Sequence, residues 1–256
     1  MESIRGSHSR RLSLAGRVVA AFSLLIAAAA WGATRDSYEV RRAPSGASMP
    51  RMATCDDAWS AAEIITWGPQ ERQTTFRALW SDAGLFVCFE ATDPQPWYTL
   101  TRRDARLWEE EVVELFIARD AAERYVEIEI NPANTVADLR IDLTNRKFDL
   151  SWDFAGLDTR VNLRRDAAGR IAGWTAVAWL PWNGFIADSQ HAGAAMTSPA
   201  QAPQARAGDR WFFNVFRIER PGGAADPQRD ALLLAWSPTG RASFHVREAF
   251  REMILR

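Results

Sequence analysis

The stretch 107-LWEEEVVELFI-117 decides the fold of this 256-residue chain. A tryptophan and an acidic cluster run directly into a segment with the period-two alternation of a β-strand. One predicted face carries Val113, Leu115 and Ile117. The other carries Val112, Glu114 and Phe116. Glu114 is therefore a carboxylate among apolar neighbours, and such a group is costly to bury unless a donor or a ligand meets it.

Trp108 presents a large flat surface just before this strand. An aromatic plane beside a carboxylate acceptor suits a sugar ring, because C–H groups stack on the indole while hydroxyls donate to the acid. A core anchor is the alternative interpretation of a single tryptophan at this position. The twelve tryptophans of the chain fit both interpretations, since some must fill the core and an excess of aromatics also fits a protein that binds flat ligands.

Short alternating segments separated by turns follow one another along the chain. A hairpin is predicted at 75–80 and 85–90, and further strands at 125–131, 137–143, 159–164, 174–180, 211–219, 231–236 and 250–255. Residues 187–209, rich in Ala, Ser, Pro and Gln, are predicted to be a long surface loop. No amphipathic helix longer than about two turns is evident. The sequence therefore predicts an all-β fold, a jelly-roll-like antiparallel β-sandwich with few short helices.

The segments 125–131 and 137–143 have two chemically different faces. We expect the inward face to carry Val126, Ile128, Ile130, Leu139, Ile141 and Leu143. We expect the opposite face to carry Glu127, Glu129, Asp138, Arg140 and Asp142. Together with the opening stretch, three successive strands would share one apolar face and one carboxylate-rich face.

The N-terminus has the pattern of an export signal. Arginines at 5, 10, 11 and 17 accompany a 13-residue apolar run at 18–30, which is short for a bilayer span, and small residues follow. We predict a signal peptide over 1–33, a linker over 34–50 and one domain over 51–256. An uncleaved membrane anchor is the alternative, and Arg10-Arg11 leaves the twin-arginine route open beside the general one. The expected location is periplasmic or secreted, with no membrane span in the mature chain.

Cysteine usage and charge narrow the class of protein further. Cys55 and Cys88 are the only cysteines, so an oxidising compartment permits one disulfide, and two buried thiols are the alternative. The 31 basic and 32 acidic residues are balanced, which gives no support for nucleic-acid binding.

The sequence contains only weak patterns of the kind that mark catalytic sites and metal sites. A glycoside hydrolase needs two carboxylates flanking the scissile bond, and no pattern singles out a pair from Glu109, Glu110, Glu111, Glu114, Glu127 and Glu129. The mature chain has only His191 and His245 and no Gly-x-Ser-x-Gly elbow, which disfavours a serine hydrolase. Zinc would need clustered His or Cys. Haem could take His245 with Met196 or Met253 as axial ligands.

A structural calcium ion is compatible with the acidic loops, because calcium takes oxygen ligands only. Candidate ligand sets are Asp104 with Glu109, Glu110 and Glu111, or Asp138 with Asp142. No calcium loop of fixed spacing is present, so the metal ligands stay undetermined, and the pattern points to no other cofactor.

An ordered set of motifs resembles carbohydrate-binding module family 9-like domains. Residues 108–117 look like the family signature W-x-x-D/E-x-V-E-x-F-I. Other parts agree in order over about residues 51–256: Asp56 with Trp59, 90–93, 125–132, Gly173-Trp174, 180–182, 214–217 and 236–238.

The resemblance implies a DOMON-like antiparallel β-sandwich that holds a polysaccharide chain end between two aromatic side chains. Trp108 matches the first aromatic and Glu114 the acidic partner. The second aromatic, a tryptophan in the sugar binders of the family, falls on Phe244, with His245 beside it. A family arginine that bonds sugar hydroxyls aligns with Glu127, and Arg140 or Arg217 could replace it. Family members also carry calcium and often stand beside glycoside hydrolase modules.

The sequence therefore predicts an exported, non-catalytic carbohydrate-binding domain for polysaccharide recognition or catabolism. Its ligand would be an oligo- or polysaccharide, and a separate glycoside hydrolase is a possible partner. Two alternatives from other classes stay open: a haem-binding redox DOMON-like module and an accessory glycoside hydrolase.

Overall fold

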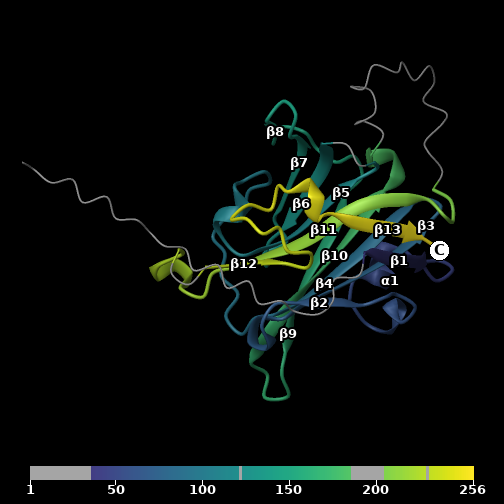
Figure 1. Cartoon of the computed structure of the whole chain (residues 1–256). Helices are drawn as coiled ribbons and strands as arrows, with labels where there is room; N and C mark the ends of the chain where they lie inside the picture. The colour runs from purple at the N-terminus through teal and green to yellow at the C-terminus, as the bar shows by residue number, and fades with distance from the viewer. Residues whose placement is uncertain (1–35, 121–122, 186–204, 229–230) are drawn as a thin grey trace, which may run out of the picture.

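A computed structural model describes residues 36–120, 123–185, 205–228 and 231–256 (Figure 1). The predicted signal peptide at 1–33 and most of the predicted loop at 187–209 lie outside these residues. In the part of the chain that is described, no helix is long and apolar enough to cross a membrane.

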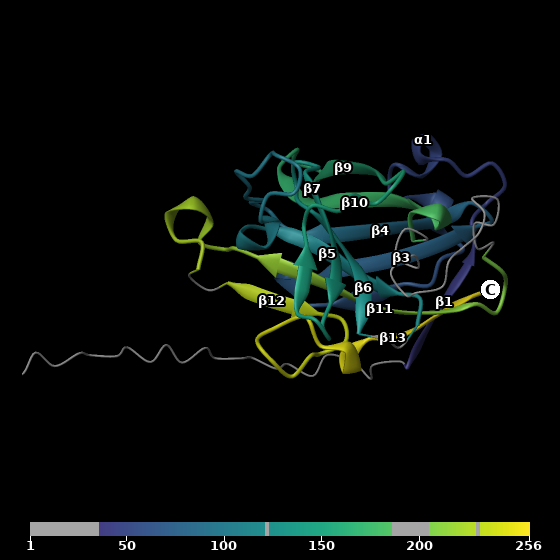
Figure 2. The ribbon, with the colours of Figure 1, turned by 90° about the horizontal axis from the view of Figure 1, so that it is seen from above.

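Strands dominate the structure, and two sheets face each other, as predicted (Figure 2). The front sheet contains β5 (Val112–Ala118), β6 (Arg124–Ile130), β7 (Val136–Asp142), β8 (Lys147–Asp149), β11 (Arg210–Glu219), β12 (Leu232–Ala235) and β13 (Arg251–Leu255). The back sheet contains β2 (Ile65–Trp67), β3 (Thr74–Ser81), β4 (Gly84–Thr92), β9 (Asp158–Arg165) and β10 (Ile171–Pro181). The strand order is β8-β7-β6-β5-β11-β13-β1-β3-β4-β10-β9, with β12 on β11 and β2 on β3.

The helical elements are short. They are α1 (Met49–Met52) and the single-turn helices η1 (Asp57–Trp59), η2 (Gln70–Arg72), η3 (Leu107–Glu109), η5 (Gly223–Ala225) and η6 (Arg247–Ala249). The chain is thus an all-β sandwich with few helical residues, as the alternation of its sequence indicates.

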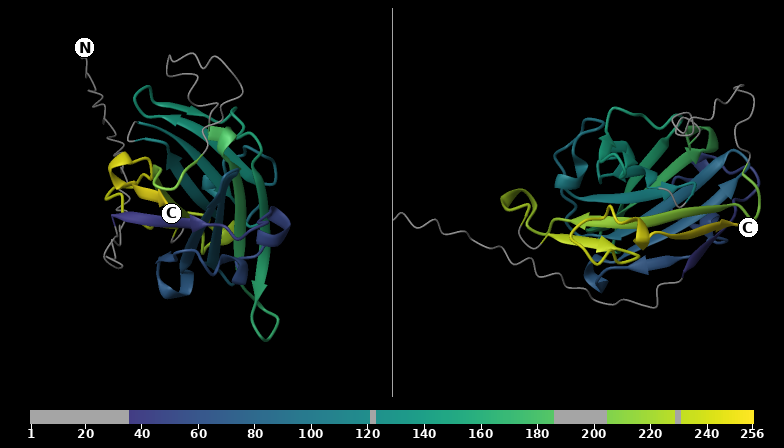
Figure 3. Two further views of the ribbon diagram at one scale, coloured as in Figure 1. Left: turned by 90° about the vertical axis from the view of Figure 1, so that its right-hand side faces the viewer. Right: turned by 45° about the horizontal axis from the view of Figure 1, so that its top comes forward.

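Strand β1 (Ser37–Arg42) corrects the prediction of a linker over 34–50. It runs parallel to β13 at Ser37 to Val40 and parallel to β3 at Arg41 and Arg42, so it joins the two sheets. Figure 3 shows β1 beside the C-terminal strand. Tyr38 and Val40 are fully buried between the sheets, which explains why a mostly polar segment is held in the fold.

Three apolar clusters explain the layering. The largest fills the space between the sheets and includes Tyr38, Trp80, Val113, Trp174 and Phe213. A second covers the outer face of the front sheet, and a third covers the outer face of the back sheet under α1 and η1. In the third cluster, Cys55 and Cys88 form a disulfide, which confirms the disulfide alternative.

The relative facing of β6 and β7 differs from the prediction. Ile128 pairs with Asp138, and Glu127 pairs with Leu139, so the carboxylates of the two strands lie on opposite faces. Leu139 and Ile141 are buried in the outer cluster instead of the inter-sheet core. Both faces of this sheet are covered, and alternation alone cannot then tell which face is inward.

Candidate functional site

Three glutamates meet on the outer face of the front sheet. Glu114 lies on β5, and Glu127 and Glu129 lie on β6, with Glu114 directly opposite Glu129. Their exposed fractions are 2%, 4% and 0%. We call this set the outer-face triad. Each residue offers one carboxylate oxygen, and these oxygens lie within 4.8 Å of one another.

Burial governs the protonation of the outer-face triad. It raises the pKa of Glu127 to about 7. Burial first, and then the neighbouring carboxylates, raise the pKa of Glu114 and that of Glu129 well above their ordinary values. The side chains of Glu127 and Glu129 hydrogen-bond to each other, and the Trp108 backbone hydrogen-bonds to Glu129. The triad is therefore a buried acidic centre with no lysine or arginine among its ion-pair partners in the described residues.

Aromatic side chains surround the triad. Phe244 stacks on Phe216 with ring centroids 4.3 Å apart, and Phe216 is the β11 neighbour of Glu114. Trp108 stands on η3, which contacts β6, and packs in the same outer cluster as Phe244. The predicted aromatic residues thus lie on the predicted carboxylate face.

His245 lies beside Tyr125 and Glu127 on this face. Its Nδ1 lies 2.6 Å from the Tyr125 hydroxyl and 3.8 Å from Glu127 Oε2. Its ring stacks on Phe116 at 5.2 Å. Burial lowers the pKa of His245 to about 4, so the ring is neutral at pH 7 and supplies no counter-charge to Glu127.

Several residues of this face were not predicted to belong to the site. Glu129, Phe116, Tyr125 and Phe216 contribute to it, and Phe148 meets His245 edge-on at 4.8 Å. Period-two alternation did place Phe116 on the face of Glu114, and Tyr125 and Glu129 on the face of Glu127, but it did not show that they border a site. Phe216 could not be found this way, because its position depends on the pairing of β11 with β5.

Arg140 does not join the outer-face triad. It lies on the side of β7 that faces the back sheet, opposite Val126. Its Nη2 is 3.3 Å from Asp149 Oδ2, and its guanidinium lies 5.5 Å from the Trp152 ring. Arg140 therefore lies on the opposite face of the sheet from Glu114 and Glu127.

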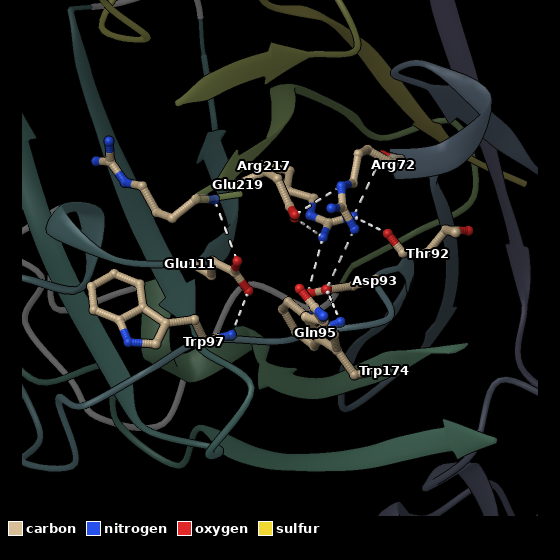
Figure 4. Close-up of polar contacts among 10 residues, drawn as sticks. Arg72, Thr92, Asp93, Gln95, Trp97, Glu111, Trp174, Arg217 and Glu219 are labelled. Atoms are coloured by element: carbon tan, nitrogen blue, oxygen red, sulfur yellow. Dashed lines mark hydrogen bonds and ion pairs between the residues drawn. The ribbon is translucent and has the colours of Figure 1, made fainter. Parts of the chain in front are cut away.

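Arg217 is also on the inward face, as the pairing of Arg217 with Val113 requires. It is fully buried and forms ion pairs with Asp93 and Glu219, shown in Figure 4. It also donates to the Thr92 carbonyl at 2.9 Å. Arg217 is thus a structural cation between the sheets, and it is not available to a ligand on the outer face.

Glu111 completes this inner network (Figure 4). Its carboxylate accepts from the Trp97 amide at 2.8 Å and from the Arg220 amide at 3.3 Å. Burial first, and then the charges of Asp93 and Glu219, raise the pKa of Glu111 to about 9. The other two carboxylates of the network, Asp93 and Glu219, each pair with the guanidinium groups of Arg217 and Arg72.

Neither predicted calcium set is assembled as a unit. Asp104 lies with Asp138 and Asp153, and the Arg103 guanidinium contacts all three. Glu111 lies in the inner network, and Asp142 pairs with Arg124 at 3.0 Å. Both of these acidic clusters contain guanidinium groups that already neutralise part of their charge, so they fit a calcium ion poorly.

The described residues do not bring together the pair of axial ligands that the haem alternative needs. Met253 is buried between the sheets, whereas His245 lies on the outer face. Met196 and His191 lie outside the described residues. Two surface hollows, of about 580 Å³ beside Glu39 and Glu63 and about 390 Å³ beside Arg42 and Asp82, contain no predicted site residue.

No protein-family model matches this chain. An extracellular protein of Arthroderma benhamiae (strain ATCC MYA-4681 / CBS 112371) is 26% identical over 192 residues, which cover 71% of this chain and 78% of the relative.

Solved structures share the fold. A protein of Bacteroides uniformis ATCC 8492, named for a presumed carbohydrate-binding role, matches with a TM-score of 0.64 at 16% identity, over 86% of this chain and 99% of that chain. A carbohydrate-binding module of family 9 from Caldicellulosiruptor kristjanssonii, in complex with glucose and with cellotriose, matches with a TM-score of 0.57 at 14% identity. These matches cover 86% of this chain and 95% and 93% of the two module chains. The chain therefore has the β-sandwich fold of family 9 carbohydrate-binding modules.

Proposed function

We propose that this chain is an exported, non-catalytic carbohydrate-binding domain whose ligand sits on the outer face of the front sheet. The observation that carries the proposal is the meeting of Trp108 and Phe244, far apart in sequence, in one cluster on the face that bears Glu114 and Glu127. A sugar ring would stack on these aromatic side chains, and its hydroxyls would donate to carboxylates.

Two comparisons support this proposal. The fold is shared with a module whose structures hold glucose and cellotriose, and a relative is an extracellular protein. The basic and apolar pattern of residues 1–33 is that of an export signal.

Stacking should contribute more to binding than hydrogen bonds do. Trp108 and Phe244 are only partly buried, whereas Glu127 Oε2 and both Glu129 oxygens have almost no exposed surface. A ligand therefore meets ring surface first. For a single sugar unit we expect a dissociation constant of roughly micromolar to millimolar size.

Calorimetry of the purified protein against a panel of mono- and oligosaccharides tests the proposal. Trp108→Ala should abolish the heat of binding. Trp179→Ala is the matched control, because Trp179 is also partly buried but packs on Phe86 at the outer face of the other sheet. No heat with any sugar, or equal heat with Trp108→Ala, would exclude this function.

A glycoside hydrolase is the second candidate. The oxygens of the outer-face triad lie within 4.8 Å of one another, which is no further apart than the roughly 5 Å between the carboxylates of retaining enzymes. The raised pKa of Glu127, about 7, would suit a general acid. Release of reducing ends from a polysaccharide panel, lost in Glu114→Gln, would favour this candidate over a pure binding domain.

A further inference from the structure

Two aromatic side chains lie outside the packing that accounts for the others. Among the tryptophans and tyrosines that the structure describes, only Trp97 and Tyr98 belong to none of the three apolar clusters. Trp97 is partly exposed, and Tyr98 is 41% exposed. Figure 4 shows the Trp97 ring pointing away from the inner network. Burial in the core therefore does not explain these two rings, which we call the aromatic pair.

The backbone that carries the aromatic pair is held in place by two buried glutamates. Glu111 accepts a hydrogen bond from the Trp97 amide at 2.8 Å. Glu110 accepts from the amides of Thr99 and Leu100 at 2.6 Å and 3.0 Å. Because this backbone is already ordered, a ligand that stacks on the aromatic pair causes little further loss of conformational entropy.

The aromatic pair adjoins the candidate sugar site. Leu100, two residues after Tyr98, packs in the same outer cluster as Trp108. Arg220 connects the two segments directly. Its Nη2 donates to the Trp108 carbonyl at 2.9 Å, and its amide donates at 3.3 Å to Glu111, which also holds Trp97. The segment that carries the aromatic pair is therefore fixed beside the segment that carries Trp108.

We propose that Trp97 and Tyr98 form a second stacking surface, which takes a further unit of a sugar chain whose first unit lies at Trp108 and Phe244. This inference rests on the proposed function and makes its ligand a chain that spans more than one unit. A sugar ring packs its C–H face on an aromatic plane. A second unit of the same chain binds without a further loss of translational freedom, so its contacts add to the affinity.

Phe148 defines the competing direction for such a chain. It is 49% exposed and meets His245 edge-on at 4.8 Å, at another border of the outer face. A chain that left the site across Phe148 would not contact the aromatic pair. The aromatic pair offers two adjacent rings, one of them an indole, and so presents more stacking surface than the single Phe148 ring.

The test compares a monosaccharide with its hexasaccharide by calorimetry, using glucose and cellohexaose, xylose and xylohexaose, and mannose and mannohexaose. For wild type we expect the hexasaccharide to bind roughly three- to tenfold more tightly than the monosaccharide. The double variant Trp97→Ala with Tyr98→Ala should bind the two equally and keep the wild-type affinity for the monosaccharide. Its melting temperature should equal that of wild type, because the aromatic pair packs in no apolar cluster.

Phe148→Ala is the matched control, because it removes an exposed ring at the other border of the site. It should keep the wild-type ratio of hexasaccharide to monosaccharide affinity. The inference is overturned if the double variant keeps that ratio, or if Phe148→Ala removes it instead. Monosaccharide binding with no gain from chain length in wild type overturns this inference alone. No binding of any sugar by wild type overturns the proposed function and this inference together.

Discussion

The Tyr125 hydroxyl lies 2.6 Å from Nδ1 of His245, which joins strand β6 to a segment 120 residues later in the chain. The His245 ring lies flat on Phe116 and presents its edge to Phe148. The next residue toward the N-terminus, Phe244, stacks on Phe216. This single hydrogen bond therefore fixes the orientation of the aromatic residues that border the candidate sugar site.

Tyr125→Phe should lower the free energy of unfolding by about 1 kcal/mol, because Nδ1 of His245 loses its hydrogen-bond partner while the ring packing is kept. Urea denaturation followed by tryptophan fluorescence measures the change. Tyr98→Phe is the control, since Tyr98 is 41% exposed, and it should be neutral. An unchanged midpoint in Tyr125→Phe would show that the bond to His245 does not stabilise the segment.

Arg217→Met should destabilise the fold by about 3–5 kcal/mol, because it leaves Asp93 and Glu219 buried without their central cation. Arg210→Met removes a cation of the same type at the surface. Arg210 is 61% exposed and pairs with Glu252 at 2.8 Å, so its loss should reduce stability by at most about 1 kcal/mol. Equal losses in the two variants, measured by urea denaturation, would contradict a structural role for the inner network.

Replacing both Cys55 and Cys88 by alanine should lower stability by about 3 kcal/mol, because the disulfide closes a loop of 33 residues in the unfolded chain. Thermal melting with and without a reductant provides the check. Reductant should lower the melting temperature of wild type and leave the double variant unchanged. If wild type that has been unfolded and reduced melts at the same temperature as oxidised wild type, the disulfide does not stabilise the fold.

Glu111 makes stability depend on pH. Its folded pKa of about 9 is above the ordinary value of about 4.3, so the unfolded chain releases this proton first as pH rises. The Glu111 contribution is therefore fully present below about pH 4.5 and is lost progressively toward pH 9. Glu111→Gln removes this loss, so its stability relative to wild type should increase between pH 4.5 and pH 9.

Urea denaturation at pH 4.5, 7 and 9 measures that difference. Glu109→Gln is the neighbouring control, because the Glu109 side chain is about half exposed and pairs with Arg106 at the surface. Its stability relative to wild type should change little with pH. A constant difference between Glu111→Gln and wild type across the three pH values would show that Glu111 does not hold a proton in the folded state.

Much of the fold was predictable from local sequence. The hairpin of β3 and β4, and strands β6, β7, β9, β10, β11, β12 and β13, fall where alternation and turn residues place them. The candidate site was partly predictable for the same reason. Glu114 and Glu127 each show as acids within an apolar pattern, and Phe244 and His245 were connected to them only through the family resemblance.

The errors about which face a residue occupies have one physical origin. Alternation gives two faces for every strand but does not say which face meets the other sheet, and here both faces of the front sheet are buried. Arg140 was therefore expected on the carboxylate face with Glu127, and it lies on the opposite face of the sheet. Strand β1 was missed because only two of its residues, Tyr38 and Val40, are buried, and its partners are distant in sequence.

Strand β1 has a consequence for how the chain is synthesised. Ser37 pairs with Glu252, the Arg256 amide donates to the Val40 carbonyl at 2.7 Å, and Trp80 Nε1 donates to the Arg256 carbonyl. An emerging chain cannot form these contacts until its last strand has left the ribosome, about ten seconds or more after its first. Closure of the sandwich at β1 therefore has to wait for β13, whereas β3 and β4 pair residues that are close in sequence and need no later strand.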